Sequence, residues 1–563
     1  MANMSLRRLA ATLGSNSVSG MAQAESLNIR PISARALCSL IFAEYSTQHY
    51  DNGRTGWNPN EFKLTVANVP QLTQLFAKSV DGTIYAQPLY VAFLLMPSDN
   101  KRHNAVYVAT ESDTVYAFDA DNGDSLWTRS LIPPGEQFVV VSDIEGCNNV
   151  APNIGITSTP VIDSLNQIMY VVAKTKQVVG SNTTFHYRLY ALDITSGADR
   201  LAPVEIAGSV PGTGDPNDGK GHVVFDPHIH LNRPGLLLLN GVVYVGFGSH
   251  CDEHLGSYHG WVFGYDAAGL TQVGVFATTP DTPAAATSAA GVWQGGMGLA
   301  ADPQGFVYFT TGNGDFTANA PGGKDYGDTV VKLTSFFGVT DYFTPSYQPT
   351  LLDGDIDLGS GGVLIVPDPP PGNNLPSTLV AAGKDGNILL INRNNMGQYT
   401  PGGPDRLLQS PPLQMAPGSP ITDATGIWGG PAYYANSGRQ LLYYCGSGGH
   451  MKAYTFSGTA LSLSMIGTNP NQSPQAFPAE GGTTPNVSSN GQAAGTAVLW
   501  AITRSNPLRL QAFDATNLTN QLFDAPAGPS NNPNGGAFIE PTTIQGKVYV
   551  PSDGQLTVFG LPP

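Results

Sequence analysis

Histidines are concentrated in one short stretch of this 563-residue chain, where five of the ten fall between positions 228 and 259. In an extended segment, side chains two positions apart point to the same side, so His228 and His230 would share one face. His250, Asp252 and His254 would do the same if their loop stays extended. Imidazole and carboxylate groups are suitable ligands for zinc or another divalent metal. One interpretation is therefore a metal site that uses His228, His230 and His254.

Two other interpretations of this cluster stay open, because the histidines show no fixed ligand spacing. The side chains could line a central cavity and act as acids, bases and hydrogen-bonding groups, with His250 or His259 as the base and Asp252 beside them. Alternatively, they are loop histidines that bond the carbonyl groups of turns. The second interpretation makes them catalytic, whereas the third makes them structural.

Aromatic and basic side chains stand at positions where they could hold a flat ligand. Trp293 and Gln294 come just before an expected strand, and Trp428 has the same place in a later repeat. Lys384 lies in a Gly-Lys-Asp-Gly turn, and Arg233 begins another repeat. A Trp face can stack on a planar ligand while an amide bonds its edge. The alternative for each Trp is packing between sheets.

These residues are carried by a repeating pattern of short strands. A complete copy contains a Val-Tyr-Val strand at 105–110, a strand ending in Asp-Ala at 114–120 and a Trp-containing strand at 122–127. Later copies run over 158–208, 233–279, 295–346, 357–410, 428–469 and 487–525, and a truncated copy covers 541–560. Apolar runs of this length, broken by Gly, Asn and Asp, are typical of strands. Repetition with a period above about 50 residues indicates a β-propeller.

We count eight copies and expect an all-β fold, an eight-bladed β-propeller of four-stranded antiparallel blades. The last copy has only three strands, and the strand expected at residues 72–80 could supply its fourth. Such an N-terminal strand would close the ring and protect the sheet edges. The expected domains are an N-terminal extension over 1–47 and one propeller over 48–563.

The segment at 117–127, Ala-Phe-Asp-Ala-Asp-Asn-Gly-Asp-Ser-Leu-Trp, resembles the tryptophan-docking repeat of the pyrroloquinoline quinone (PQQ)-type propellers, the quinoprotein alcohol dehydrogenase-like family. Weaker copies stand at 190–197, 265–267 and 511–515. The resemblance implies that Trp127 packs under the next blade. It also implies alcohol oxidation with PQQ and a divalent cation such as calcium. In the methanol dehydrogenase branch a Trp and a disulfide of adjacent cysteines enclose the cofactor, but this sequence has no adjacent cysteine pair.

The four cysteines, Cys38, Cys147, Cys251 and Cys445, form no Cys-x-x-Cys motif, so neither a zinc ribbon nor a c-type haem is indicated. A Cys147–Cys251 bridge between neighbouring blades is one alternative. We favour the other, in which all four are buried thiols.

Charge and hydropathy exclude some partners. The formal net charge of −16 disfavours nucleic acid and anionic membranes as partners. No apolar run approaches the roughly 18 residues that a transmembrane helix needs. Arg7 and Arg8 precede an apolar stretch, and Ala22-Gln-Ala24 has the form of a cleavage site, so we interpret this end as a degenerate export signal of a secreted or periplasmic protein, expected to be a monomer.

Two classes of function are consistent with these features. In the first, an enzyme holds a small organic substrate in the axial funnel, and the resemblance favours PQQ-type alcohol oxidation with Arg233 or Lys384 polarising the quinone and Trp293 under its ring. A variant without cofactor would be a lyase, isomerase or cyclase in the same pocket. In the second class the propeller is a binding or scaffold module. The expected site comprises Arg233, His250, Asp252, His259, Trp293, Gln294, Lys384 and Trp428.

Overall fold

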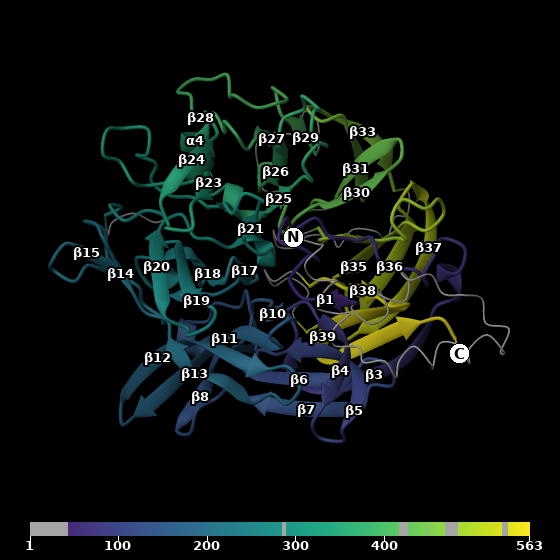
Figure 1. The fold of residues 1–563 in the computed structure, drawn as a ribbon. Coiled ribbons are helices and arrows are strands. Elements are labelled where there is room, and N and C mark those ends of the chain that lie inside the picture. The colour runs from purple at the N-terminus through teal and green to yellow at the C-terminus, as the bar shows by residue number, and fades with distance from the viewer. Residues whose placement is uncertain are drawn as a thin grey trace. The chain divides into compact units, whose positions relative to one another are not determined.

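The computed structural model describes residues 43–562, except for 284–288, 416–425, 448, 468–481 and 532–538 and the side chains of Glu253 and His254. Residues Ala43–Pro563 form one compact unit. The regular secondary structure of the described chain consists almost entirely of strands, which form eight sheets of three to six strands and one two-stranded hairpin. Within the compact unit the sheets follow one another around a common centre in chain order (Figure 1).

The first four large sheets contain most of the strands between residues 44 and 344, apart from two N-terminal strands that join the last two sheets. The first contains β1 (Glu44–Tyr45), β4 (Leu89–Met96), β5 (Lys101–Ala109), β6 (Thr114–Asp119) and β7 (Ser125–Ser130). The second contains β8 (Glu136–Val140), β9 (Asn153–Ile154), β10 (Val161–Asp163), β11 (Ile168–Val179), β12 (Asn182–Asp193) and β13 (Asp199–Glu205). The hairpin β14 (Ser209–Pro211) and β15 (His222–Val224) precedes the third, which contains β16 (His230–Leu231), β17 (Leu237–Leu239), β18 (Val242–Ser249), β19 (Trp261–Asp266) and β20 (Gln272–Ala277). The fourth contains β21 (Ala300–Ala301), β22 (Val307–Thr310), β23 (Val330–Leu333), β24 (Val339–Thr344) and β28 (Gln398–Tyr399).

The other four sheets contain most of the C-terminal half. The fifth contains β25 (Val363–Ile365), β26 (Thr378–Ala382), β27 (Asn387–Asn392) and β29 (Leu413–Gln414), and the sixth β30 (Ala432–Asn436), β31 (Arg439–Tyr444), β32 (Lys452–Phe456) and β33 (Leu461–Ile466). The seventh contains β2 (Trp57–Asn58), β34 (Asn486–Ser488), β35 (Val498–Thr503), β36 (Leu508–Asp514) and β37 (Asn517–Gly528), and the eighth β3 (Thr73–Thr83), β38 (Thr542–Ile544) and β39 (Lys547–Gly560). Helical turns are short: α4 (Gln348–Asp353), η2 (Val69–Gln71), η3 (Val141–Ile144), η4 (Asp252–Leu255), η5 (Gln294–Gly296) and η6 (Leu358–Ser360).

Burial explains why these sequences form stacked sheets. The central strand β18 is buried along almost its whole length, whereas the outer strand β20 is mostly exposed or half-buried. Apolar residues on both faces of β18 therefore pack against neighbouring sheets. The turn from β17 to β18 is Asn240-Gly241, and both residues have positive φ (51° and 79°). A two-residue turn with this geometry favours Asn-Gly and fixes the hairpin register.

Two expectations about the repeats are confirmed. Strand β3 pairs antiparallel with β39, from Thr73 opposite Gly560 to Thr83 opposite Asp553, so the N-terminal strand joins the last repeat. The indole nitrogen of Trp127 donates a hydrogen bond of 2.9 Å to the carbonyl of Ile194, which follows β12 in the next sheet. The resemblance that predicted this docking therefore describes the packing correctly.

An inner strap, residues 43–61, contacts at least one strand of every large sheet. Arg54 is fully buried within it and donates to Leu299 O, Leu236 O, Gln48 O and Thr47 Oγ1. The strap's other polar groups bond the sheets in chain order: β1 pairs with β4, Ser46 bonds β10, Asn52 bonds β17 and β21, Gly53 bonds β25, Thr55 bonds β30, Gly56 bonds β34 and Asn58 bonds β38. A single segment therefore ties together all eight large sheets.

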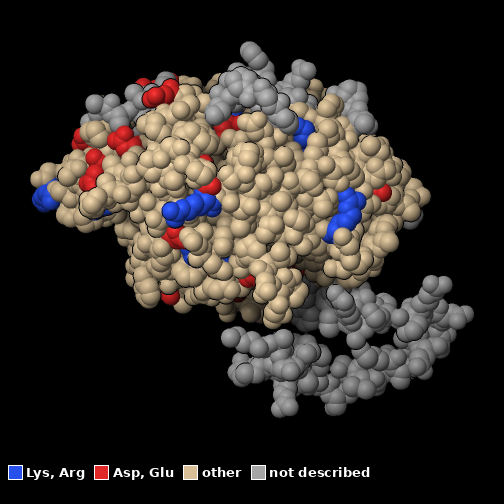
Figure 2. Space-filling view, turned by 90° about the horizontal axis from the view of Figure 1, so that it is seen from above, with Lys and Arg blue, Asp and Glu red and all other residues tan. Residues whose placement is uncertain are grey.

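No helix in the described part of the chain is long and apolar enough to cross a membrane. Basic side chains lie apart from one another on the face shown in Figure 2.

Candidate functional site

A cavity of about 60 Å³, which opens to solvent, is lined by five of the residues expected from the sequence. Trp293 and Trp428 precede the first strands β21 and β30, whereas Asp252 and Lys384 lie in the loops after β18 and β26. Arg233 reaches it from the segment after β16. The complete lining consists of Asn149, Arg233, Cys251, Asp252, Trp293, Gly295, Asp357, Ser360, Lys384 and Trp428. Loops from several sheets therefore converge on one site.

The Trp293 indole is fixed at this site by close contact with backbone. Its Nε1 donates a hydrogen bond of 3.1 Å to the carbonyl of Ser249. A Cβ placed on Gly248, Gly291 or Gly312 would lie 2.3, 2.6 or 2.4 Å from the indole, so only glycine lets the ring occupy this position. The glycines of the Gly-Val-Trp and Thr-Gly-Asn-Gly segments thus form the socket of Trp293.

Lys384 is held by two carboxylates. Its Nζ lies 2.7 Å from Asp357 Oδ2 and 3.4 Å from Asp355 Oδ1, and it donates to the carbonyl of Asp355. Burial by itself would lower the pKa of Lys384, but the charges of Asp357 and Asp355 raise it above its usual range. The lysine is therefore a fixed cation at the wall of the cavity.

Asn313 lies directly behind this ion pair. Its backbone N–H donates to Asp357 Oδ1 (2.7 Å) and its side-chain amide donates to Asp355 (2.9 Å). The Oδ1 atom of Asn313 is buried and has no hydrogen-bond partner. A buried acceptor left in this state is costly unless another donor or a cation satisfies it.

The cysteine expectation was wrong. Cys147 and Cys251 form a disulfide with an S–S distance of 2.05 Å, and Cys251 lines the cavity. Cys147 follows η3 in an insertion between β8 and β9 of the second sheet, and its neighbours in space rather than in sequence decide the pairing. Cys445 is buried, and Cys38 lies outside the described residues.

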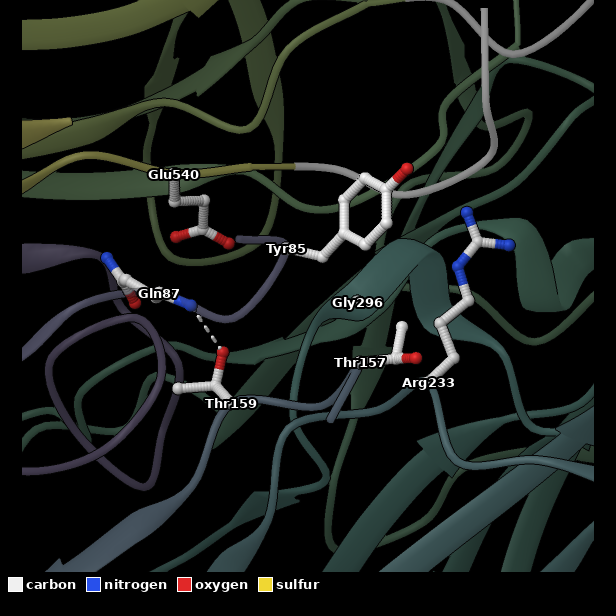
Figure 3. Close-up of a pocket in the computed structure, with 7 residues that line it drawn as sticks. All are labelled: Tyr85, Gln87, Thr157, Thr159, Arg233, Gly296 and Glu540. Atoms are coloured by element: carbon white, nitrogen blue, oxygen red, sulfur yellow. Dashed lines mark hydrogen bonds between the residues drawn. The ribbon is translucent and has the colours of Figure 1, made fainter. Parts of the chain in front are cut away.

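A second, smaller chamber shares Arg233 with the cavity. Figure 3 shows Tyr85 and Arg233 on one side of it and Gln87, Thr159 and Glu540 on the other. Glu540 accepts from Gln48 Nε2 (2.6 Å) and lies 2.8 Å from His49 Nδ1, while His49 Nε2 lies 2.9 Å from the carbonyl of Pro431. Gln48 and His49 of the inner strap therefore hold Glu540 in the lining of this chamber.

His250 and His259 lie outside the cavity, contrary to expectation. His250 Nε2 lies 2.7 Å from the buried Nζ of Lys174, which holds it behind the wall. His259 Nε2 donates to the carbonyl of Asp215 (2.8 Å), and burial lowers the pKa of His259 to about 4. Both rings are 1% exposed, so they bond protein groups rather than a ligand.

The expected metal ligands are also occupied by protein groups. His230 Nε2 accepts hydrogen bonds from Trp261 Nε1 (3.1 Å) and from the His259 backbone N–H (3.3 Å), so it carries no proton. Its Nδ1 donates to the carbonyl of Asp226, and burial lowers the pKa of His230 to about 3. His228 Nε2 donates to the carbonyl of Asp143. The side chain of His254 lies outside what the structure describes, and no group of three or more His, Cys, Asp or Glu residues that could hold a metal occurs among the described residues.

Gln294 is buried and does not line the cavity. Its Nε2 donates to the carbonyl of Met297 and its Oε1 accepts from the Thr310 N–H, so it fixes the turn after Trp293. Its placement beside the site is thus correct, but its amide is used within the fold.

Sequence reasoning missed Asp357 and Asn313. Asp357 is the first residue of the repeat at 357–410, which is the position that Trp428 has in the next repeat. That shared position was the available signal, because side chains at the start of a first strand face the centre of the ring. The Lys384 cation was expected, but its carboxylate partner 27 positions earlier was not sought.

No family model matches the chain, and no curated protein matches its sequence. Solved structures do match. Quinohemoprotein alcohol dehydrogenase from Comamonas testosteroni has a TM-score of 0.59 at 15% identity, with 94% of this chain and 82% of that chain covered. Quinohemoprotein alcohol dehydrogenase ADHIIG from Pseudomonas putida HK5 has 0.57 at 14% identity over the same shares. A europium-containing methanol dehydrogenase has 0.58 at 13% identity, over 92% of this chain and 98% of that chain.

The chain has their fold. It is a β-propeller of the kind found in these quinoprotein dehydrogenases. At such identities the likeness concerns the fold alone, and activity has to be inferred from the site.

Proposed function

We propose that the protein is a quinoprotein-type oxidoreductase that oxidises a small alcohol in the cavity of Trp293 and Lys384. The observation that carries the proposal is the buried Lys384–Asp357 pair, which places a cation and a proton acceptor side by side. A cation can polarise a carbonyl oxygen while a carboxylate removes a hydroxyl proton. Both groups are needed for alcohol oxidation.

The residues present fit PQQ, which is flat, aromatic and carries carboxylates. Trp293 offers an indole face, and Arg233 and Lys384 offer positive charge for quinone and carboxylate oxygens. Cys251 brings a disulfide to the lining, although it joins positions 104 apart and not adjacent cysteines. The sequence therefore lacks an adjacent cysteine pair, but one residue of a disulfide, Cys251, still belongs to the lining of the cavity.

The residues also fit a divalent cation such as calcium. The buried Oδ1 of Asn313 has no partner, and the adjacent carboxylate of Asp357 and that of Asp252 line the same cavity. Carboxylate and amide oxygens are the ligands that calcium prefers. We propose that these three side chains would hold the cation.

The chain's own residues would act as follows. Arg233 and Lys384 bind and orient the anionic ligand, and Trp293 excludes water from one face of it. Asp357 accepts the proton of the substrate hydroxyl at a carboxylate oxygen, and the ammonium of Lys384, 2.7 Å away, holds that carboxylate at the wall of the cavity. When bound, PQQ supplies the acceptor for the hydride of the carbinol carbon.

Reconstitution tests this proposal. The purified protein is titrated with PQQ and Ca²⁺ while absorbance is recorded, and oxidation of a panel of small alcohols is followed with an artificial electron acceptor. We expect saturable PQQ binding and turnover that disappears in Asp357→Asn. A protein that binds no PQQ in the presence of Ca²⁺ would contradict the proposal.

A lyase, isomerase or cyclase reaction without cofactor is the second candidate. It is favoured by the two basic and two acidic side chains that line one cavity, Arg233, Lys384, Asp252 and Asp357. This candidate predicts turnover of a substrate in the complete absence of PQQ. A non-catalytic binding or scaffold role would leave the cavity variants with wild-type function.

We also propose eight blades, because the inner strap bonds eight large sheets in chain order. The disulfide supports a secreted or periplasmic location, since such bonds persist in oxidising compartments. We propose a monomer, and light scattering would test it.

A further inference from the structure

Two consecutive residues at the rim of the cavity have left-handed backbone. Cys251 has a φ of 48° and Asp252 a φ of 54°. Side chains other than glycine rarely adopt this region, because Cβ approaches the carbonyl oxygen too closely. Such strain persists only where the surrounding structure imposes it, and it is concentrated at functional sites.

The segment before this pair is firmly held. The backbone N–H of His250 donates to the carbonyl of Ile229 (3.0 Å), and its Nε2 lies 2.7 Å from Lys174 Nζ. Lys174 also donates to the carbonyls of His228 and His230. The chain therefore enters Cys251 from a fixed position.

The other end of the disulfide is also anchored. Cys147 is 3% exposed and packs with Ile144 and Val150 in one apolar cluster. Two ion pairs fasten the rest of its insertion to the long hairpin β11–β12: Lys176 Nζ lies 2.5 Å from Asp143, and Arg188 Nη1 lies 2.7 Å from Glu136. Cys147 is thus a rigid attachment point for Cys251.

The fixed backbone at Cys251 determines the position of the next residue, Asp252. Its carboxylate lines the cavity and accepts a hydrogen bond from Tyr258 Oη (3.3 Å). Its negative charge also contributes to the raised pKa of Lys384. A change of φ at 251 and 252 to the common negative range would redirect this side chain. The carboxylate's place in the cavity therefore depends on the left-handed backbone.

We infer that the Cys147–Cys251 disulfide is a positioning device that holds Asp252 in the cavity, so that the composition of the site depends on the redox state of this bond. A dithiol reductant that supplies two electrons and two protons would convert the bond to two thiols. Cys251 and Asp252 would then relax, and the carboxylate would leave the cavity. The inference goes beyond the proposed function, because it concerns how Asp252 is held and not what the cavity binds.

Two double variants separate the role of the bond from that of the backbone. Both Cys147→Ala with Cys251→Ala and Cys147→Ala with Cys251→Gly remove the cross-link. Only the glycine variant adopts a positive φ at 251 without steric cost. The glycine variant is therefore the matched control.

Crystal structures of the wild type and the two variants give the direct readout. We expect left-handed residues 251 and 252 in the wild type and the glycine variant, and a relaxed backbone with Asp252 outside the cavity in the alanine variant. An alanine variant that keeps Asp252 in place would overturn the inference. If that variant does not fold, wild-type crystals soaked in dithiothreitol replace it, and an unmoved Asp252 after reduction has the same meaning.

Terbium binding provides a solution readout that does not need PQQ. Trp293 and Tyr258, whose ring centroids are 5.7 Å apart, would sensitise Tb³⁺ luminescence at the cavity. We expect the alanine variant to bind Tb³⁺ about tenfold more weakly than the wild type and the glycine variant to regain most of that loss. Equal weakening in both variants would contradict backbone positioning. No Tb³⁺ signal in the wild type would count against the proposed cation site, and the crystal structures would still decide the inference.

Discussion

The ammonium of Lys384 lies 2.7 Å from the carboxylate of Asp357, at the wall of a cavity that also contains Trp293. The same ammonium lies 3.4 Å from Asp355, so one cation has two carboxylate partners. The Asp357 side chain is 8% exposed and that of Asp355 is 70% exposed. Of the two carboxylates, only that of Asp357 lines the cavity.

Asp357→Asn should therefore lower the rate of alcohol oxidation by roughly 100-fold or more, which is the usual effect of losing a general base. Binding of PQQ, measured by absorbance titration, should change little. Asp355→Asn is the matched control, because it removes the same charge from the same lysine at an exposed position. Equal losses in the two variants would show that charge alone, and not proton transfer, is responsible.

Glu111 predicts a loss of stability as the pH rises. The residue is fully buried, and burial raises the pKa of Glu111 from 4.5 to about 8. Between these values the folded protein binds more protons than the unfolded chain, so the free energy of unfolding falls with rising pH, by at most about 1.4 kcal/mol per pH unit. Thermal unfolding between pH 5 and 8 measures this slope.

Glu111→Gln should reduce that slope, because the amide stays neutral and still accepts from the Gly155 N–H and the Thr157 hydroxyl. Asp113, whose pKa is also raised by burial, keeps part of the pH dependence in the variant. An unchanged slope would mean that Glu111 is ionised in the folded protein.

His259 predicts the opposite behaviour at acid pH. Because burial lowers the pKa of His259 to about 4, stability should be lost as the pH falls from about 6.5 towards 4. His259→Ala should reduce this acid sensitivity. It should also cost about 2–3 kcal/mol at neutral pH, since the bond to Asp215 is lost and a void is left. Denaturant unfolding measures both effects, and a fully stable variant that fails to bind ligand would restore the catalytic interpretation of this residue.

Substitutions of Trp127 test how much the contact between neighbouring sheets contributes to stability. Trp127→Ala should destabilise by about 2–3 kcal/mol, less than a fully buried Trp would, because the indole is only half-buried. Trp127→Phe keeps most of the contact area and loses the bond to Ile194, so it should cost about 1 kcal/mol. Urea midpoints of the two variants measure the difference. Equal costs would indicate that the hydrogen bond, and not the ring packing, joins the sheets.

The parts of the fold that were predictable are those that repeat. Strand type, the pairing of residues 72–80 with the last repeat and the docking of Trp127 follow from local patterns that recur along the chain. The inner strap was not predictable, because residues 43–61 have no repeat of their own. Its structure is imposed by contacts with sheets that are hundreds of positions away.

The candidate site was predictable where position in the repeat decided it. Trp293, Trp428 and Lys384 were found from their places beside expected strands. The prediction that His250 and His259 line the cavity was wrong, because a dense cluster of titratable side chains has the same sequence pattern whether it faces a cavity or bonds carbonyls. The position of the His250 ring is determined by its contact with Lys174, and that of the His259 ring by its bond to Asp215. Neither partner is adjacent in sequence.

The inner strap also affects how the protein unfolds. In a protein built of repeats, each unit touches only its neighbours, so the array can open one unit at a time. Here a single segment bonds at least one strand of every large sheet, and Arg54 within it donates to the carbonyl of Leu236, just before β17 of the third sheet, and to that of Leu299, just before β21 of the fourth. Separating any one sheet would disturb the inner strap, which also bonds all the other large sheets. The ring should therefore behave as one cooperative unit, and proteases should find few partly opened forms to cut.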